Sequence, residues 1–293
     1  MTVRLATDWK DYQLLDSGDG ERLEKWGPYC LIRPDPQVIW PRSPKADWSA
    51  WDGRYQRSSS GGGQWEFRRQ LPPEWVITYR KWKFTVRPTN FKHTGLFPEQ
   101  AVNWDWLEKR LRERSQAGPR PTVINLFGYT GAATLAAASA GAEVCHVDAA
   151  KGMVQWCRDN LALNQLDNAP VRYLVEDCFR FVQREIRRGR TYDAIILDPP
   201  SYGRGKGGEM WKLEDQLWSF LQETRKLLSE NPLAVVLNTY TAYLSSTVME
   251  NLLRDALEGL GGHFTTSEIA LPSLATGRPL PGGSTVLWEK DEG

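Results

Sequence analysis

The residues after position 121 alternate between short apolar runs and longer segments with the three-to-four-residue spacing of amphipathic helices. Strands and helices that alternate in this way are joined by right-handed crossovers, which place the strands parallel in one sheet. Two final apolar runs have no clear helix between them, so we expect the last strand to be antiparallel. The expected strands are 122–127, 143–148, 171–176, 192–198, 233–240, 263–271 and 284–290, and the expected helices are 134–141, 153–166, 179–188, 213–229 and 246–260. The pattern predicts an α/β fold with a Rossmann-like, seven-stranded, mostly parallel sheet.

The residues before position 122 have a different character. The first 50 residues consist of short strand-like runs broken by turns, and 75–86 has the aromatic and β-branched content of a strand. Residues 102–115 have helical spacing, and 58–63 (SSSGGG) predicts a flexible loop. No internal repeat is visible in either half. We therefore expect a small β-rich domain over 1–90, a connecting segment and helix over 91–121, and a larger domain over 122–293.

Composition limits the partners and the compartment. The chain has 37 basic and 36 acidic residues, and its four cysteines form no CxxC pair. That cysteine pattern favours a reducing cytoplasm and argues against structural zinc or any other metal. No apolar run reaches the roughly 18 residues of a membrane-spanning helix, so no membrane partner is expected. The sequence does not indicate an oligomeric state.

Ligands of open parallel sheets bind beyond the carboxyl ends of the strands, so the residues that follow each strand deserve inspection. A glycine-containing loop, FGYTGAAT, follows the first expected strand. A dinucleotide favours the fuller GxGxxG pattern, whereas S-adenosylmethionine (SAM) has no phosphate and requires only close approach of the backbone. We therefore expect this loop to bind SAM through Phe127, Gly128, Tyr129, Thr130 and Gly131.

Two acidic residues follow the next two strands. Asp148 comes 20 residues after Gly128, which suits a carboxylate that accepts hydrogen bonds from ribose hydroxyls. Asp177 follows the third strand, where its side chain could accept from an adenine amino group. Asp is also a favoured N-cap, and a helix is expected to begin just beyond position 177, so a capping role remains an alternative.

The fourth strand ends in DPPSYGRG, the most distinctive motif of the chain. Consecutive prolines fix the backbone, and we expect them to leave carbonyls unpaired. A rigid strand end of this kind could aim Asp198, the main chain at Pro199 and Pro200, and Tyr202 at the transferred methyl group and at the accepting atom. Asp198 is therefore expected to contact the cofactor as well. The glycines at 203, 205, 207 and 208 would then form a mobile flap, which also carries Arg204.

Together these segments resemble class I SAM-dependent methyltransferases of the bacterial large-subunit (23S) ribosomal RNA group, which includes cytosine-C5 and guanine-N7 enzymes. The resemblance covers most of residues 90–240 and rests on NLFGYTGAAT, Asp148, Asp177 and DPPSYGRG, preceded by HTGLFPEQ at 93–100. It implies that Phe97 and Gln100 close over SAM near its methionine moiety. It also matches Lys151 to the cofactor site, Asp148 to the ribose and Asp177 to the adenine.

One departure from that group concerns the reaction. The cytosine-C5 branch has a nucleophilic cysteine near position 240, whereas this chain reads LNTYTAY, and Thr239, Tyr240 and Thr241 cannot form a thiolate adduct. Cytosine C5 needs such covalent activation before it can accept a methyl group. We therefore expect direct in-line transfer to a nitrogen or oxygen, for which positioning and a neighbouring carboxylate or carbonyl suffice.

The front segment differs from the RNA-binding module of the cytosine-C5 branch, and it suggests a partner of its own. Between positions 54 and 92, nine basic residues face only two acidic ones, with aromatic residues interleaved. Basic side chains neutralise phosphates and aromatic rings stack on unpaired bases, so the segment could bind RNA. Core packing and a solvated face are the alternatives for this segment. Arg278 lies in TGRPLPGG (276–283), between the last two expected strands, where a plain turn is the alternative to a substrate contact. The candidate substrate contacts are Arg68, Arg69, Arg80, Lys81, Arg204 and Arg278.

The leading hypothesis is thus a SAM-dependent methyltransferase that acts on RNA, most readily a base nitrogen of ribosomal RNA. Methylation of a protein or small molecule is a second hypothesis, supported by the net charge of only +1. A third is an RNA assembly factor that binds SAM without turnover.

Overall fold

A computed structural model of the 293-residue chain describes residues 2–58, 62–204, 210–240 and 244–291. The residues group into two compact units, both discontinuous in sequence. The larger unit contains residues 1–4, 102–269 and 283–293, and the smaller one contains residues 5–101 and 270–282. Residues 59–61 of the predicted glycine-rich loop at 58–63 lie outside the described ranges.

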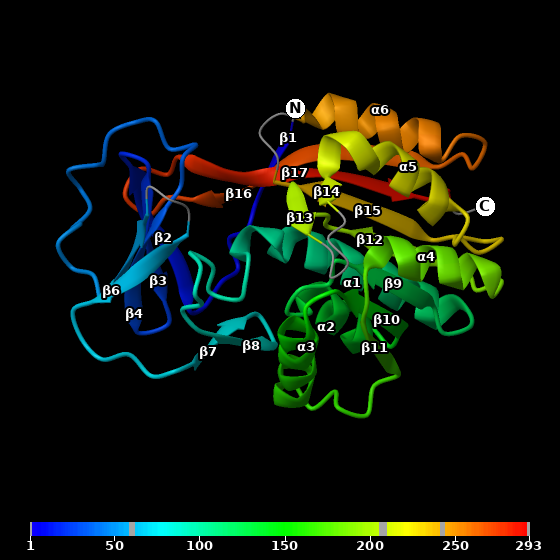
Figure 1. The fold of residues 1–293 in the computed structure, drawn as a ribbon, viewed down its shortest axis with the longest axis horizontal. Coiled ribbons are helices and arrows are strands. Elements are labelled where there is room, and N and C mark those ends of the chain that lie inside the picture. Colours follow the sequence, from blue (N-terminus) through cyan, green and yellow to red (C-terminus); the bar gives the residue numbers. More distant parts are fainter. Residues whose placement is uncertain (1, 59–61, 205–209, 241–243, 292–293) are drawn as a thin grey trace. The chain divides into compact units, whose positions relative to one another are not determined.

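The larger unit is built on one mixed sheet in the order β1-β16-β17-β15-β12-β9-β10-β11 (Figure 1). The middle strands β9, β10, β11, β12 and β15 are parallel to one another, and β17 runs antiparallel to β15. The α/β prediction and the antiparallel last strand are therefore confirmed. The strands are β1 (Thr2–Leu5), β9 (Thr122–Leu126), β10 (Glu143–Asp148), β11 (Val171–Val175), β12 (Ala194–Leu197), β15 (Ala234–Thr239), β16 (His263–Pro272) and β17 (Pro279–Glu289).

Helices cover both faces of this sheet. One face packs against α4, α5 and α6 in a single apolar core that contains Phe181, Phe220 and Leu253 (Figure 1). The alternating residues of the strands point to the opposite face, where α2 contacts β9 and β10, and α3 contacts β10 and β11. The helices are α1 (Ala101–Ala117), α2 (Ala132–Ser139), α3 (Lys151–Leu163), α4 (Cys178–Arg187), α5 (Leu213–Arg225) and α6 (Ser246–Ala256).

Two features of the sheet depart from the sequence-based expectation. The sheet has an eighth strand, β1, at the edge beside β16, because four residues at the start of the chain pair there. The segment TGRPLPGG was expected to be a loop, but β17 already begins at Pro279. Prolines and glycines are tolerated in strands at edges and bends, so this composition did not prevent pairing. The turn that precedes β17 spans 274–276.

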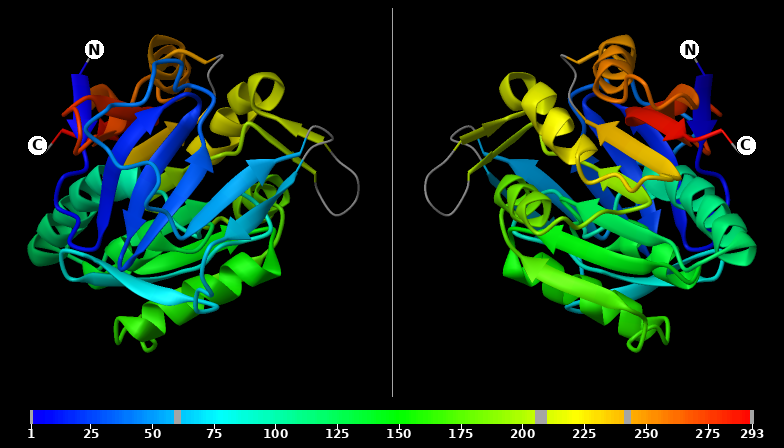
Figure 2. Two further views of the ribbon diagram at one scale, coloured as in Figure 1. Left: turned by 90° about the vertical axis from the view of Figure 1, so that its left-hand side faces the viewer. Right: turned by 90° about the vertical axis from the view of Figure 1, so that its right-hand side faces the viewer.

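The smaller unit contains a five-stranded sheet in the order β2-β3-β4-β5-β6, visible as the blue and cyan strands of Figure 2. Residues 75–86 were expected to form one strand, but they form a separate hairpin of β7 and β8. The chain turns at Arg80, whose φ of 46° lies in the left-handed region that a continuous strand cannot contain. The strands are β2 (Tyr12–Gly18), β3 (Glu21–Trp26), β4 (Tyr29–Pro34), β5 (Gly53–Arg57), β6 (Gly63–Phe67), β7 (Trp75–Tyr79) and β8 (Trp82–Val86).

The tryptophans of this unit supply much of its core. Trp26 is fully buried, and Trp51, Trp75 and Trp82 are less than 10% exposed. Trp26 packs edge-on against Tyr12 with 4.8 Å between the ring centroids. Core packing therefore accounts for these four residues.

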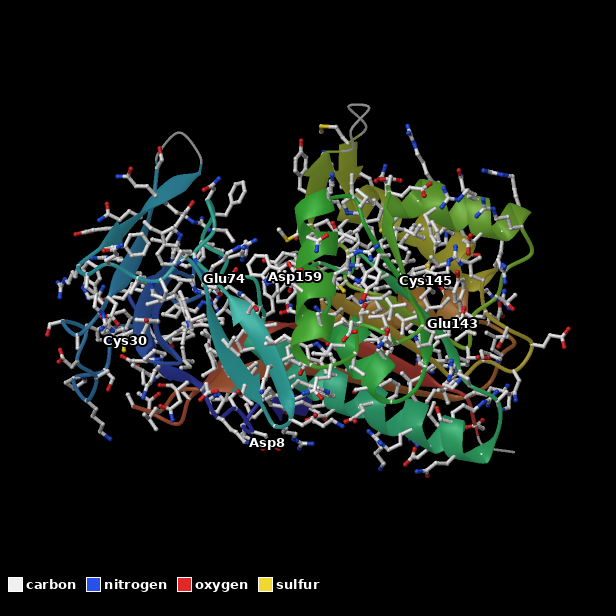
Figure 3. All side chains as sticks on the ribbon, turned by 90° about the horizontal axis from the view of Figure 1, so that it is seen from below. Asp8, Cys30, Glu74, Glu143, Cys145 and Asp159 are labelled. Carbon is white, nitrogen blue, oxygen red and sulfur yellow. The ribbon has the colours of Figure 1, made fainter. Side chains whose placement is uncertain are left out.

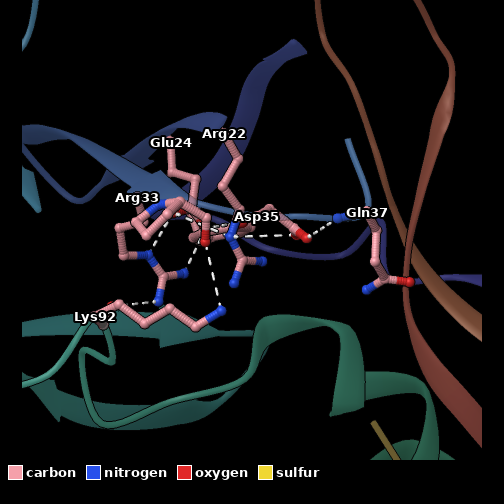
Figure 4. Close-up of polar contacts among 8 residues, drawn as sticks. Arg22, Glu24, Arg33, Asp35, Gln37 and Lys92 are labelled. Carbon is pink, nitrogen blue, oxygen red and sulfur yellow. Dashed lines mark hydrogen bonds and ion pairs between the residues drawn. The ribbon is translucent and has the colours of Figure 1, made fainter. Parts of the chain in front are cut away.

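A buried charged cluster lies beneath β3 and β4 (Figure 4). Arg33 donates two hydrogen bonds to the Glu24 carboxylate, from Nε over 2.6 Å and from Nη2 over 2.7 Å, and both side chains are buried. Burial raises the pKa of Glu24, but Arg33 and Arg22 outweigh it and hold that pKa at about 2. Burial and the neighbouring arginines lower the pKa of Lys92 to about 8. The cluster is thus a charged core in which arginine pairing keeps Glu24 ionised.

Candidate active site

The carboxyl ends of β9, β10, β11 and β12 meet at one edge of the sheet, because these four strands are parallel neighbours. The structure brings together four predicted features there: the loop 127–131, Asp148, Asp177 and Asp198. We call this set the strand-end site. All of its members belong to the larger unit. In the described ranges, no group of three or more His, Cys, Asp and Glu side chains is arranged to hold a metal ion.

The loop 127–131 has an unusual backbone. Phe127 and Tyr129 have φ values of 58° and 50° although neither is glycine, and Gly131 has a φ of 84°. Non-glycine residues rarely adopt this region, and they persist there only when the surrounding structure holds them. The Gly131 N–H donates to the carbonyl of Gly128 over 3.0 Å, which closes the turn before α2.

The two glycines are required by protein packing. A Cβ on Gly128 would overlap the imidazole of His146, and a Cβ on Gly131 would overlap the sulfur of Cys157. The sequence suggests that these glycines allow close approach to a ligand, but the space beside each Cα is filled by β10 or α3. The two glycines therefore let the loop pack closely against β10 and α3. This close packing places Tyr129 next to the end of β10.

Asp148 is held by two backbone N–H groups. Tyr129 N donates to Oδ2 over 2.9 Å, and Ala150 N donates to Oδ1 over 2.8 Å. Burial raises the pKa of Asp148 above its ordinary value, and these hydrogen bonds partly offset the rise. Each carboxylate oxygen has two lone pairs, so each can accept one more hydrogen bond. The accepting capacity that remains suits the two hydroxyl groups of a ribose.

Asp177 is the N-cap of α4, since its Oδ1 accepts from Arg180 N over 3.0 Å. The capping alternative is thus the role that the structure shows directly. A carboxylate that caps with one oxygen keeps acceptor sites on the other, so the cap does not conflict with a contact to adenine. Glu176 N donates to the carbonyl of Asp148 over 3.1 Å, which joins the ends of β10 and β11.

The DPP motif (198–200) accepts two side-chain hydrogen bonds that the sequence does not predict. Asp198 Oδ1 accepts from Asn238 Nδ2 over 2.9 Å. The carbonyl of Pro200, which the sequence predicts to be unpaired, accepts from Trp211 Nε1 over 2.6 Å. Trp211 also packs against Phe127, with 5.5 Å between the ring centroids. One tryptophan therefore connects the strand end after β12 with the loop after β9.

Tyr202 begins a short hairpin of β13 (Tyr202–Arg204) and β14 (Met210–Lys212). Its hydroxyl donates to Met210 Sδ over 3.0 Å, and its side chain is 50% exposed. Gly203 pairs with Trp211 across this hairpin, so it belongs to a strand and not to a flap. The other predicted flap glycines at 205, 207 and 208 lie outside the described residues.

The remaining cofactor candidates differ in position. Lys151 is the exposed first residue of α3, three residues after Asp148, so it lies at the same edge of the sheet. Phe97 and Gln100 belong to the smaller unit, where Phe97 precedes the 3-10 turn Pro98–Gln100. Their assignment to SAM therefore stays a prediction from the resemblance.

The basic candidates of the smaller unit already have partners. Arg69 pairs with Asp52 over 2.6 Å, and Arg80 pairs with Asp8. The Arg68 guanidinium lies 3.9 Å from the ring centroid of Trp51, and the Lys81 ammonium lies 5.4 Å from that of Trp82. Arg278 follows a turn and lies 5.3 Å from the ring centroid of Trp40. Arg68, Arg69 and Arg80 remain exposed despite these contacts.

The four cysteines are free thiols, and none is activated. Cys145 on β10 and Cys30 on β4 are labelled in Figure 3, and Cys157 lies within α3. Burial raises the pKa of Cys145 to about 11 and raises those of Cys157 and Cys178 further. A thiol with a raised pKa is a poor nucleophile at neutral pH.

The sequence did not predict two residues that hydrogen-bond to the DPP motif, Asn238 and Trp211. The sequence around Asn238 indicates only that the segment LNTYTAY lacks a cysteine, and no local pattern singles out Trp211. A buried polar residue at the end of a parallel strand was the available signal for Asn238, because such side chains need hydrogen-bond partners.

Comparison with known proteins agrees with the geometry. Residues 47–238 match the family model of S-adenosylmethionine-dependent methyltransferases. The solved structure of a SAM-dependent methyltransferase from Agrobacterium tumefaciens is 38% identical, with a TM-score of 0.93 over 99% of this chain and 94% of that one. Ribosomal RNA large subunit methyltransferase K of Neisseria meningitidis is 27% identical over 81% of this chain and 66% of its own length. Ribosomal RNA large subunit methyltransferase K/L of a Shewanella species is 30% identical over 58% of this chain but only 23% of its own length.

Proposed function

Because this chain belongs to the S-adenosylmethionine-dependent methyltransferase family, we propose that it methylates RNA, and specifically a base nitrogen of ribosomal RNA. The observation that carries the proposal is the similarity over 81% of the chain to a relative named as a ribosomal RNA large subunit methyltransferase. The chain spans 66% of the length of that relative. The substrate named for the relative is therefore a proposal for this chain. The four thiols are free, which supports a cytoplasmic location, where RNA is available.

The residues of the strand-end site fit the cofactor. Asp148 would accept from the ribose hydroxyls, and the loop 127–131 would lie against the cofactor with its backbone fixed by Gly128 and Gly131. Asp177 would accept from the adenine amino group with the oxygen that is not used for capping. When bound, SAM supplies an electrophilic methyl group on its sulfonium.

Asp198 would act at the acceptor. Its carboxylate can accept a hydrogen bond from an amino or imino N–H of a base, and so orient the nitrogen lone pair for in-line attack. The main chain at Pro199 and Pro200 fixes the strand end, and the exposed ring of Tyr202 can stack on a base. No covalent intermediate is needed, because a nitrogen carries its own lone pair.

The choice of a nitrogen as the acceptor atom is supported by the thiols and by β15. Thr239 is buried and donates to Met249 Sδ over 3.1 Å, so it offers no nucleophile to a pyrimidine ring. Cys178 is also buried, and burial raises its pKa well above the ordinary value. Methylation at cytosine C5 requires a thiolate, so these residues favour nitrogen.

For the smaller unit we propose a role in RNA recognition through Arg68, Arg69, Arg80 and Lys81. Arg68 and Arg69 are exposed near the end of β6, and the Arg68 guanidinium lies over the ring of Trp51. Arginine that is already paired can still contact phosphates, but part of its charge is offset. The Asp8 and Asp52 pairs therefore also support the competing proposal of a protein or small-molecule substrate.

Nucleoside mass spectrometry of ribosomal RNA from cells with and without this protein tests the proposal. We expect one N-methylated nucleoside to disappear in its absence and to return when purified protein and tritium-labelled SAM are added to the stripped RNA. A labelled C5-methylcytosine would contradict the assigned atom. Label in a protein or small molecule, with none in RNA or ribosomal subunits, would contradict the RNA substrate and leave the methyltransferase assignment intact.

A further inference from the structure

A chain of polar side chains leads from the first strand of the protein to Asp198. Asn238 Nδ2 donates to Asp198 Oδ1 over 2.9 Å, and Thr285 Oγ1 donates to Asn238 Oδ1 over 2.6 Å. Asn103 Nδ2 donates to Thr285 Oγ1 over 3.0 Å. Arg4 Nη2 donates to Asn103 Oδ1, and Arg4 Nε donates to Ser267 Oγ over 2.9 Å.

The members come from four separate elements of the larger unit. Arg4 lies on β1, Asn103 on α1, Thr285 on β17 and Asn238 on β15 (Figure 1). Thr285 is fully buried, and Asn103 and Asn238 are at most 4% exposed. A buried polar group that loses its partner costs free energy, so each member depends on the next for its hydrogen bond.

The direction of the hydrogen bonds is fixed by chemistry at one end. An arginine can only donate, so Arg4 must face an acceptor, and Asn103 must present its oxygen to Arg4. The Asn103 amide nitrogen then faces Thr285, whose single hydroxyl proton is left for Asn238 Oδ1. Asn238 must therefore present its amide N–H groups to Asp198. Every donor in the chain points away from the Arg4 cation and toward the Asp198 carboxylate.

We infer that Arg4, Asn103, Thr285 and Asn238 are positioning residues that hold the Asp198 carboxylate as an oriented hydrogen-bond acceptor. None of them touches the reacting atoms in this scheme, because they act through Asn238. The role of Asp198 in methyl transfer rests on the proposed function. The orientation of its carboxylate does not, and it can be measured without any acceptor.

The first test compares Thr285→Val with Thr224→Val. Valine has the shape of threonine but can neither accept from Asn103 nor donate to Asn238. Thr224 is a matched control, because it is also buried and its hydroxyl bonds only to carbonyls within α5. In protein labelled with 13C at the aspartate carboxyl carbons, Asp198→Asn identifies the Asp198 signal. We expect Thr285→Val to move that signal and Thr224→Val to leave it in place.

Kinetics provide a second readout, with tritiated SAM and ribosomal RNA from cells that lack the protein. We expect kcat of Thr285→Val to fall about tenfold, as for loss of a transition-state contact, with little change in KM for SAM. Thr285→Ser keeps a hydroxyl for both hydrogen bonds and should restore the wild-type carboxyl signal and kcat. A merely structural residue would show neither the split between kcat and KM nor the rescue.

Asn103→Asp separates positioning from folding. The carboxylate that this substitution introduces still accepts from Arg4, but it draws the Thr285 proton toward itself and leaves Asn238 Oδ1 without a donor. The new charge-assisted pair with Arg4 offsets the cost of the unpaired Asn238 oxygen, so we expect this variant to melt near the wild-type temperature while the Asp198 signal moves as in Thr285→Val. An unmoved Asp198 signal in both Thr285→Val and Asn103→Asp would overturn the inference. If the Asp198 signal moves but RNA accepts no methyl group, the series of hydrogen bonds from Arg4 to Asp198 is supported and the RNA substrate is refuted.

Discussion

The backbone N–H of Tyr129 donates to Oδ2 of Asp148 over 2.9 Å, and this bond ties the loop after β9 to the end of β10. Tyr129 can reach Asp148 because its backbone adopts a φ of 50°, an uncommon conformation for a residue with a side chain. The conformation of the loop and the orientation of the carboxylate are therefore established together. Both the loop and the carboxylate are therefore preorganised for a cofactor that contacts the two of them.

Replacement of Asp148 by alanine is expected to weaken SAM binding roughly tenfold to a hundredfold, the cost of losing hydrogen bonds to a charged acceptor. Isothermal titration calorimetry with SAM measures the change. Asp159→Ala is the control, because Asp159 lies exposed on the neighbouring helix α3 (Figure 3) and accepts from Gln155. Equal affinities in the two variants would remove Asp148 from the cofactor site.

The affinity for SAM should also depend on pH. Burial raises the pKa of Asp148 above its ordinary value of 3.8, so the carboxylate takes up a proton at a higher pH than an exposed Asp would. Only the ionised form can accept from both ribose hydroxyls, so affinity should fall as the pH drops toward that raised pKa. Titrations from neutral pH downward should show this loss in the wild type, and Asp148→Asn should lack it.

Replacement of Asp198 by alanine is expected to lower kcat about a hundredfold, as for loss of a group that positions a reactant. The Kd for SAM should change far less, since Asp198 is assigned to the acceptor. Single-turnover transfer of label and calorimetry with SAM separate the two effects. A variant that loses affinity and turnover by the same factor would place Asp198 among the cofactor contacts alone.

Gly131→Ala is expected to destabilise the protein by about 3 kcal/mol or more, because the new Cβ is both strained and overlapped by Cys157. Gly259→Ala isolates the strain, since Gly259 has a φ of 83° and open space around it. That control should lose only about 1 kcal/mol. Thermal denaturation measures both, and equal losses would show that contact with Cys157 is unimportant.

Glu24→Gln should destabilise the smaller unit by about 3 kcal/mol at neutral pH, because Arg33 would be left beside a neutral group in the core. The pKa of Glu24 is lowered from 4.5 to about 2, so its stabilising effect is complete above 4.5 and is lost as the pH falls toward 2. The difference between wild type and variant should shrink over that range. Asp8→Asn breaks an exposed pair with Arg80 and should cost less than about 1 kcal/mol throughout. Urea denaturation at several pH values measures both differences.

The sequence predicted most of the larger unit, because hydrophobic spacing determines strands and helices locally. It also located Asp148, Asp177 and Asp198, since topology alone places strand-end residues at one edge. It could not reveal that β1 joins the far edge of the sheet. Four residues carry too little periodicity to show a strand, and their partner β16 lies near the opposite end of the chain.

The hairpin of β7 and β8 was missed for a different reason. Its turn residues, Arg80 and Lys81, are not the Gly or Asn that normally mark a two-residue turn. Similarly, Trp211 gives no local sign that it will bond to the carbonyl of Pro200, because that contact depends on the packing of α5 and its preceding strand. Periodicity reports burial, whereas hydrogen-bond partners are decided by tertiary structure.

The place of β17 between β15 and β16 has a consequence for how the protein is made. The ribosome makes β17 after β1, β15 and β16, yet in the sheet β1 and β16 are connected to the parallel strands through β17. Until residues 279–289 emerge, the nascent sheet ends at β15 with an open edge, and Asn238 has no Thr285 to meet. A ribosome-bound intermediate could therefore fold the glycine loop while Asn238, which donates to Asp198, still lacks the hydrogen bond from Thr285. The hydrogen bonds behind Asp198 would then be completed in a single step, when β17 pairs with β15.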